Sequence, residues 1–214
     1  MLRPIAFTLR IPVIASAAAL GMVLPVLAGD NNILFIEQDA ASGGLGNSLF
    51  VDQSLASESV VAGDAAGSAP ARQSGGNNAG EIALEGAGAM VIFSQVNTDP
   101  FAGANTATIE GGSLASVVLR QEGFGNDGAL DIGAGGNAGS LTQIGNDNTG
   151  AVRVSGTDST GDLTQIGNAN TYTLDVTGNG ASVQWNQVGN ALGSNTPAQV
   201  TTNAGTVTVT QQSF

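Results

Sequence analysis

The sequence predicts an all-β protein, specifically a β-solenoid of stacked strand-turn-strand rungs with a period of about 22 residues. Three observations predict it. A Gln-x-Gly-x-x-Asn motif recurs at a fixed step, apolar and polar residues alternate on either side of it, and the connecting segments are rich in Gly, Asn, Asp and Thr. Alternation indicates strands with one buried face, whereas these four residue types favour tight turns.

The step of the repeat is measured on its glutamine, which occurs at Gln73, Gln95, Gln121, Gln143, Gln165, Gln187 and Gln211. Four of the six intervals are 22 residues, and the other two are 26 and 24. The longer intervals contain the segments 99–104 and 193–198, both with Pro and Gly, which we expect to bulge outward as turns.

The other motif positions are expected to form the turns. A glycine follows two residues after five of the glutamines, at Gly75, Gly123, Gly145, Gly167 and Gly189. An asparagine follows after five residues at Asn78, Asn126, Asn148 and Asn170. Glycine lets the chain leave the strand tightly, and asparagine closes the turn with a side-chain hydrogen bond.

The strand ending in each glutamine has a predicted inner and outer face. We expect the inward residues to include Leu141, Gln143, Leu163, Gln165, Trp185 and Gln187, and the outward ones Thr142, Thr164 and Asn186. About eleven residues after each glutamine comes a second alternating strand. On that strand Asp131, Arg153 and Asp175 are 22 residues apart, so an outward column with the arginine between two acids is expected.

The recurring glutamine has a physical explanation in such a stack, because rungs in register turn each motif position into a column of like residues. An amide side chain both donates and accepts hydrogen bonds, so a column of Gln or Asn forms an amyloid-like ladder. An inward glutamine is then paired with its neighbour, whereas leaving it unpaired would cost about 1–3 kcal/mol.

Composition limits the location and partners of the chain. Residues 1–28 carry Arg3, Arg10 and an apolar run, and resemble a secretory signal peptide cleaved after Ala28; a transmembrane anchor is the competing interpretation. Without residues 1–28 the chain has three Arg and 17 Asp and Glu, which gives a net charge of −14. This charge disfavours nucleic acid and anionic membranes as partners. The chain has no Cys and therefore no disulfide framework.

The mature chain divides into two parts. Residues 29–66 contain ILFIEQ and SLFVDQ, which look like half-units ending in glutamine, so the segment is either divergent repeats or an export region. Residues 67–214 form the predicted repeat solenoid.

At these residues the units resemble curlin repeats, the building blocks of curli, the secreted amyloid fibres of bacterial biofilms. The resemblance covers the chain from Gly67 onward. Curlin units typically carry a second Gln about eleven residues after the first, where this chain has instead the aliphatic residues Leu84, Ile132, Val154 and Val176.

The resemblance implies a structural subunit with no cofactor. It implies export through an outer-membrane pore and polymerisation outside the cell, where the homopolymer serves biofilm matrix and adhesion. Other curlin-type subunits or a nucleator are the further partners it implies. Independently, the segment TVTVTQQSF has the pattern of an uncapped strand, and an open strand edge favours addition of another strand.

Other functions are less well supported by the residues. Because the sequence has no His, Cys or Lys, we expect no enzyme. The alternative to a fibre is a monomeric secreted solenoid, such as a surface adhesin module or a calcium-binding protein resembling nonapeptide β-rolls in residues 123–139. An ice-binding solenoid is suggested by TVTVT alone.

Overall fold

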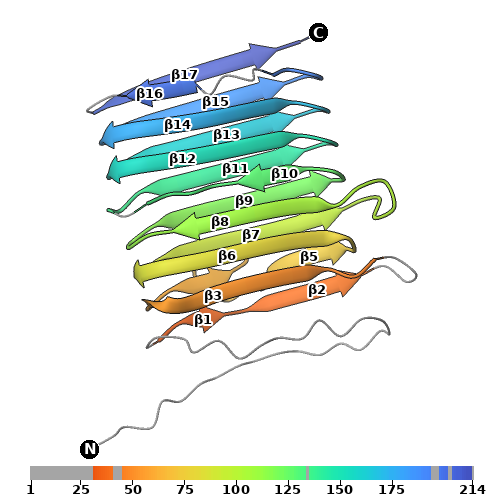
Figure 1. Ribbon diagram of the computed structural model, residues 1–214, viewed down its shortest axis with the longest axis horizontal. Coiled ribbons are helices and arrows are strands. Elements are labelled where there is room, and N and C mark those ends of the chain that lie inside the picture. The colour runs from red at the N-terminus through yellow and green to blue at the C-terminus, as the bar shows by residue number, and fades with distance from the viewer. Residues whose placement is uncertain (1–30, 41–44, 134, 194–197, 202–203, 214) are drawn as a thin grey trace, which may run out of the picture.

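The computed structural model describes residues 31–40, 45–133, 135–193, 198–201 and 204–213. Within these ranges the protein contains only β-strands, stacked in parallel as a β-solenoid of about seven turns (Figure 1). The predicted fold class is therefore confirmed. None of the described residues belongs to a helix that could span a membrane. The expected signal peptide lies outside the described residues.

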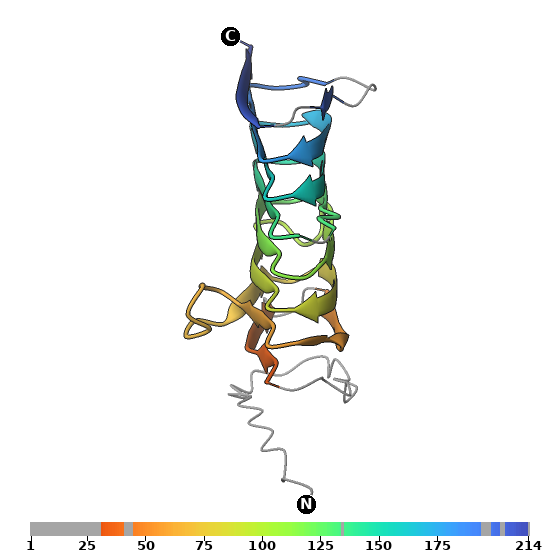
Figure 2. The ribbon, with the colours of Figure 1, turned by 90° about the vertical axis from the view of Figure 1, so that its left-hand side faces the viewer.

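Two parallel sheets face each other across a narrow interior (Figure 2). The first, here called the glutamine sheet, contains β1 (Ile33–Leu34), β2 (Ile36–Ala40), β4 (Val60–Ala62), β5 (Ala71–Gly75), β7 (Met90–Asn97), β9 (Ser116–Gly123), β11 (Ala138–Ile144), β13 (Thr160–Ile166), β15 (Ala181–Val188) and β17 (Gly205–Gln212). The second, the facing sheet, contains β3 (Ser48–Ser57), β6 (Asn78–Ala87), β8 (Asn105–Gly111), β10 (Asp127–Ala129), β12 (Thr149–Thr157), β14 (Thr171–Asn179) and β16 (Ala198–Thr201).

The register of the glutamine sheet follows the repeat. Gln143 of β11 pairs with Gln121 of β9 on one side and with Gln165 of β13 on the other. Because parallel strands in this register superpose equivalent residues, each motif position forms a column along the solenoid axis. The columns continue through β15 and β17, where Gln187 pairs with Gln211.

The inward and outward assignments made for the glutamine sheet are confirmed. Fully or almost fully buried positions are Leu141, Gln143, Leu163, Gln165, Trp185 and Gln187. The residues between them, Thr142, Thr164 and Asn186, are part-exposed. The hydrophobic core is a thin layer between the sheets, and many stacked rungs bury it where one rung could not.

The facing sheet supplies the aliphatic column expected at the second glutamine position of curlin units. Its members, Leu84, Ile132, Val154 and Val176, are each no more than 2% exposed. Only around Ile132 is the strand shorter than expected. Strand β10 ends at Ala129 because Asp131 has a φ of 85°, outside the range of extended backbone.

The turns accommodate the extra residues of the longer interval between Gln95 and Gln121. Residues 99–104 leave the solenoid as a loop between β7 and β8 (Figure 1), and Phe101 on it is 77% exposed. This agrees with the expected outward bulge. Of the second expected bulge, residues 194–197 lie outside the described part of the chain.

The segment between residues 29 and 66 contributes strands to the solenoid. ILFIEQ forms β1 and most of β2 in the glutamine sheet, whereas SLFVDQ lies in β3 of the facing sheet. Gln38 pairs with Gln73 and extends the glutamine column, although 35 residues separate the two. Most of the excess over 22 residues arises because residues 63–70 leave the sheet between β4 and β5.

Candidate functional site

The central feature of the interior is a ladder of glutamine side chains. In every step the Nε2 of one glutamine donates to the Oε1 of the next glutamine toward the C-terminus. The steps are Gln38 to Gln73 (2.6 Å), Gln73 to Gln95 (2.7 Å), Gln95 to Gln121 (2.7 Å), Gln121 to Gln143 (2.8 Å), Gln143 to Gln165 (2.9 Å), Gln165 to Gln187 (2.8 Å) and Gln187 to Gln211 (2.9 Å). All the glutamines predicted to stack therefore lie in one ladder with a single direction.

The inner glutamines of the ladder, from Gln73 to Gln165, also connect the two sheets. The Nε2 of Gln143 donates to the backbone carbonyl of Asp127 at 2.9 Å, and that of Gln165 to the carbonyl of Thr149 at 3.0 Å. Both amide protons are thus used, one along the stack and one across it. This second bond was not predicted, because it depends on which strand lies opposite.

Small residues on the facing sheet make room for the ladder. A Cβ added to Gly150 would lie 2.9 Å from the Oε1 of Gln165 and 3.1 Å from the Nε2 of Gln143. At the next rung the equivalent position is Tyr172, which stacks on Trp185 with ring centroids 4.0 Å apart. There the Nε2 of Gln187 donates to the carbonyl of Leu192 at 3.3 Å.

A second, mostly buried ladder is formed by asparagines at the turns that follow the glutamines from Gln38 to Gln165. Its side-chain bonds run from Nδ2 to the Oδ1 of the preceding member: Asn78 to Asn47 (2.9 Å), Asn105 to Asn78 (3.2 Å), Asn126 to Asn105 (3.2 Å) and Asn148 to Asn126 (3.0 Å). At Asn170 the backbone N–H donates to the Oδ1 of Asn148 at 3.1 Å. The side-chain donors of this ladder point toward the N-terminus, opposite to those of the glutamines.

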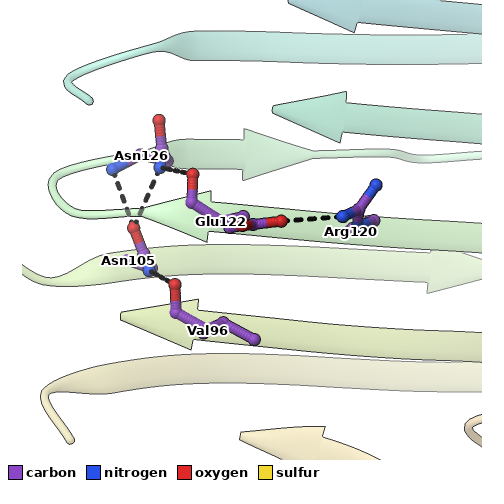
Figure 3. A network of polar contacts seen from close by, with 5 residues as sticks. All are labelled: Val96, Asn105, Arg120, Glu122 and Asn126. Atoms are coloured by element: carbon purple, nitrogen blue, oxygen red, sulfur yellow. Dashed lines mark hydrogen bonds and ion pairs between the residues drawn. The ribbon is translucent and has the colours of Figure 1, made fainter. Parts of the chain in front are cut away.

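Asn105 was missed by the sequence prediction, which found no asparagine at the fifth residue after Gln95. The inserted loop moves the turn, so Asn105 takes the column position instead. Figure 3 shows it beneath Asn126, whose backbone N–H donates to the Asn105 Oδ1 at 3.1 Å, while the Asn105 Nδ2 donates to the carbonyl of Val96 at 3.3 Å.

The predicted turn glycines all have left-handed backbone, with φ values of 95° at Gly75, 119° at Gly123, 117° at Gly145, 119° at Gly167 and 136° at Gly189. Stacking excludes a side chain as well, since a Cβ at Gly145 would lie 2.0 Å from the carbonyl oxygen of Gly167. Two constraints therefore act on one position, and glycine satisfies both.

A third, exposed ladder lies one residue past Gly145, Gly167 and Gly189 and was not predicted. The backbone N–H of Asn146 donates to the Oδ1 of Asn168 at 2.9 Å, and that of Asn168 to the Oδ1 of Asn190 at 2.8 Å. The Gln-x-Gly-Asn pattern of the three C-terminal motifs was the available signal.

The outer faces carry the charged residues. Arg120 and Glu122 on β9 form the single salt bridge among the described residues, at 2.7 Å with both side chains about half exposed (Figure 3). Arg153 and Asp175 pair in register, as expected from their spacing. Asp131, like these two residues, lies on the outer face, as predicted. No ion pair joins Arg153 to either acid, because a solvated pair gains little from contact.

Metal ligands do not gather in the described part of the chain, where no three acidic residues lie close enough to hold an ion. Chemically, the arrangement supplies hydrogen-bond donors, acceptors and strand edges at the two ends of a stack. The outer edges of β1 and β17 pair with no described strand.

The chain matches no protein-family model, no curated protein and no solved structure. The resemblance to curlin repeats therefore rests on the motif residues and on their spacing.

Proposed function

We propose that this protein is a secreted structural subunit that self-assembles into extracellular, curli-like amyloid fibres for biofilm matrix and adhesion. Export through an outer-membrane pore and assembly with further curlin-type subunits or a nucleator belong to the same proposal. The observation that carries it is the one-directional glutamine ladder, which spans the described rungs and ends at strand edges that no described strand covers.

The chemistry of the ladder supports assembly because each rung offers the next rung the same set of partners. Within the chain, one added rung pairs a strand in each sheet and a Gln with a Gln, as at Gln143 and Gln165. A second copy of the chain offers these partners too. Stacked amide ladders of this kind stabilise cross-β assemblies.

A pair of double variants tests the role of the ladder. Gln143→Ala with Gln165→Ala removes two adjacent members and leaves the Nε2 of Gln121 and the Oε1 of Gln187 without their ladder partners. At about 1 kcal/mol for each lost amide hydrogen bond, the cost is a few kcal/mol, enough to slow nucleation more than tenfold. Fibre formation by residues 29–214 is measured with thioflavin fluorescence and electron microscopy.

The matched control is Thr142→Ala with Thr164→Ala, one residue away on the outer face of the same strands. Both side chains are part-exposed, and the bond from the Thr164 Oγ1 to the Asp162 Oδ1 at 3.5 Å lies outside the ladder, so we expect a lag time close to that of the wild type. Equal lag times for all three proteins would show that the glutamine ladder does not hold the assembly together. A wild-type chain that stays a monomeric β-rich protein would overturn the proposed function and favour the monomeric solenoid.

A further inference from the structure

At the two ends of the solenoid, the hydrophobic core residues are only partly buried. The hydrophobic residues that are only partly buried against the core are Leu34, Ile36, Leu49, Ala198, Val200, Val207 and Val209. Every one of them lies in β1, β2, β3, β16 or β17, which are the first and last strands of the two sheets. The incomplete burial of the core is therefore confined to the end rungs.

The two ends match column by column. The strand pairings connect Leu34, through Val61 and the equivalent residues of each rung, to Val207. The glutamine ladder likewise runs from Gln38 to Gln211. Each end of the glutamine sheet thus presents apolar residues and then a glutamine at the same two-residue spacing.

The direction of the ladder makes the ends complementary rather than identical. Each glutamine uses Nε2 toward the C-terminal end and Oε1 toward the N-terminal end. Among the described residues, Gln211 donates no side-chain bond and Gln38 accepts none. A donor at one end therefore corresponds to an acceptor at the other.

Charge also makes the two ends different, because acidic residues lie at the N-terminal end only. Glu37 and Asp39 are exposed on either side of Gln38, whereas the equivalent residues of β17 are the uncharged Thr210 and Gln212. A contact between two N-terminal ends would bring these acids together, and like charges directly opposite destabilise a strand pair. A contact of β17 with β2 brings each acid next to an uncharged polar residue.

We infer that the C-terminal rung of one copy docks on the N-terminal rung of the next in a single register, with Gln211 on Gln38. This inference rests on the proposed function, and adds the two ends that meet and their alignment. The interface is heterologous, since different surfaces of the same chain meet, and repetition of such a contact gives an open-ended filament. The filament is therefore polar.

Cysteine cross-linking tests the ends and the register. The sequence has no native cysteine, so introduced thiols are the only ones present. In the inferred register, residues 37 and 210 lie on adjacent parallel strands about 4.8 Å apart, within reach of a disulfide. Fibres are grown from a mixture of Glu37→Cys and Thr210→Cys copies, oxidised, dissolved in denaturant and analysed by mass spectrometry.

We expect the 37–210 disulfide to dominate by at least tenfold over 37–37 and 210–210. Glu37→Cys mixed with Thr208→Cys is the register control, because residue 208 lies two positions further along the same outer face; it should cross-link far less. Fibres with predominantly 37–37, 210–210 or 37–208 disulfides would overturn the inference and leave the proposed function standing. Failure of the wild-type chain to form fibres would overturn both.

Discussion

Ala169 illustrates how stacking decides the conformation of a single residue. It lies in the turn after β13 with a φ of 55°, a left-handed conformation that costs an ordinary residue about 1 kcal/mol. The position two rungs earlier is occupied by Gly125, with a φ of 66°. Alanine is held in this conformation because the turn must superpose on its neighbours, as in the bond from the Ala169 N–H to the Asn146 carbonyl at 2.9 Å.

We therefore predict that Ala169→Gly stabilises the folded chain by about 0.5–1 kcal/mol, because glycine adopts the left-handed conformation without strain. The same substitution in extended backbone, Ala151→Gly in β12, should destabilise it by a similar amount, since glycine lowers strand stability. Urea unfolding followed by circular dichroism measures both. Destabilisation by both substitutions would contradict the prediction.

At the scale of the element, strand β13 carries a carboxylate that the fold partly removes from water. Asp162 is half-buried on the outer face, in register between Ser140 and Gln184. Burial raises the pKa of Asp162 above its usual value of 3.8, while hydrogen bonds from Gln184, Thr164 and Ser140 oppose the rise. Desolvation, which disfavours the charged form, is the larger effect.

The sign of the resulting pH dependence follows from proton binding. Between 3.8 and the raised pKa the folded chain holds a proton that the unfolded chain has lost, so the stability contributed by this residue falls as pH rises through that window. Above the window the loss is constant. We predict that the stability of Asp162→Asn relative to the wild type increases as pH rises from 3 to 7, by under about 1 kcal/mol because solvent screens a half-exposed group.

The control for Asp162→Asn is Glu81→Gln, which removes one negative charge from an exposed position of β6. Thermal unfolding of the wild type and both variants across this pH range gives the comparison. If Glu81→Gln gains as much stability with rising pH as Asp162→Asn, the effect comes from net charge and not from burial of Asp162.

At the scale of the whole molecule, net charge opposes the proposed association of copies. The full chain has a net charge of −12, and residues 29–214 carry −14, from 3 Arg and 17 acidic residues. Asp175 is the last charged residue and lies one rung before the end of its sheet, so stacked copies bring acids to about two rung spacings, roughly 10 Å, from one another. This is well within the Debye length of about 30 Å at 0.01 M salt. Repulsion between copies therefore slows their encounter at low ionic strength.

Raising sodium chloride from 10 mM to 300 mM at neutral pH should accordingly shorten the lag of fibre formation several-fold. Glucose at equal osmolality, which leaves the Debye length unchanged, serves as the control and should have little effect. Thioflavin kinetics measure both. A lag that is independent of salt would show that net charge does not limit assembly.

Much of this protein could be predicted from the sequence because its repeat is regular. The fixed interval between Gln143 and Gln165, together with the alternation before each of them, was sufficient to predict strands, inward faces, the turn glycines and stacking in columns. This works because in a solenoid each rung contacts its own sequence neighbours one period away. Periodicity along the chain then determines adjacency in space.

Only the tertiary structure decided which residues join the ladders at irregular intervals and which bonds connect the two sheets. Gln38 and Asn105 join their ladders over intervals of 35 and 27 residues, because loops absorb the excess while the columns keep their register. The opposed directions of the Gln and Asn ladders, and the bond from Gln165 to the carbonyl of Thr149, depend on which strand faces which. Spacing along the chain carries no information on the strand across the core, which folding alone brings within hydrogen-bond distance.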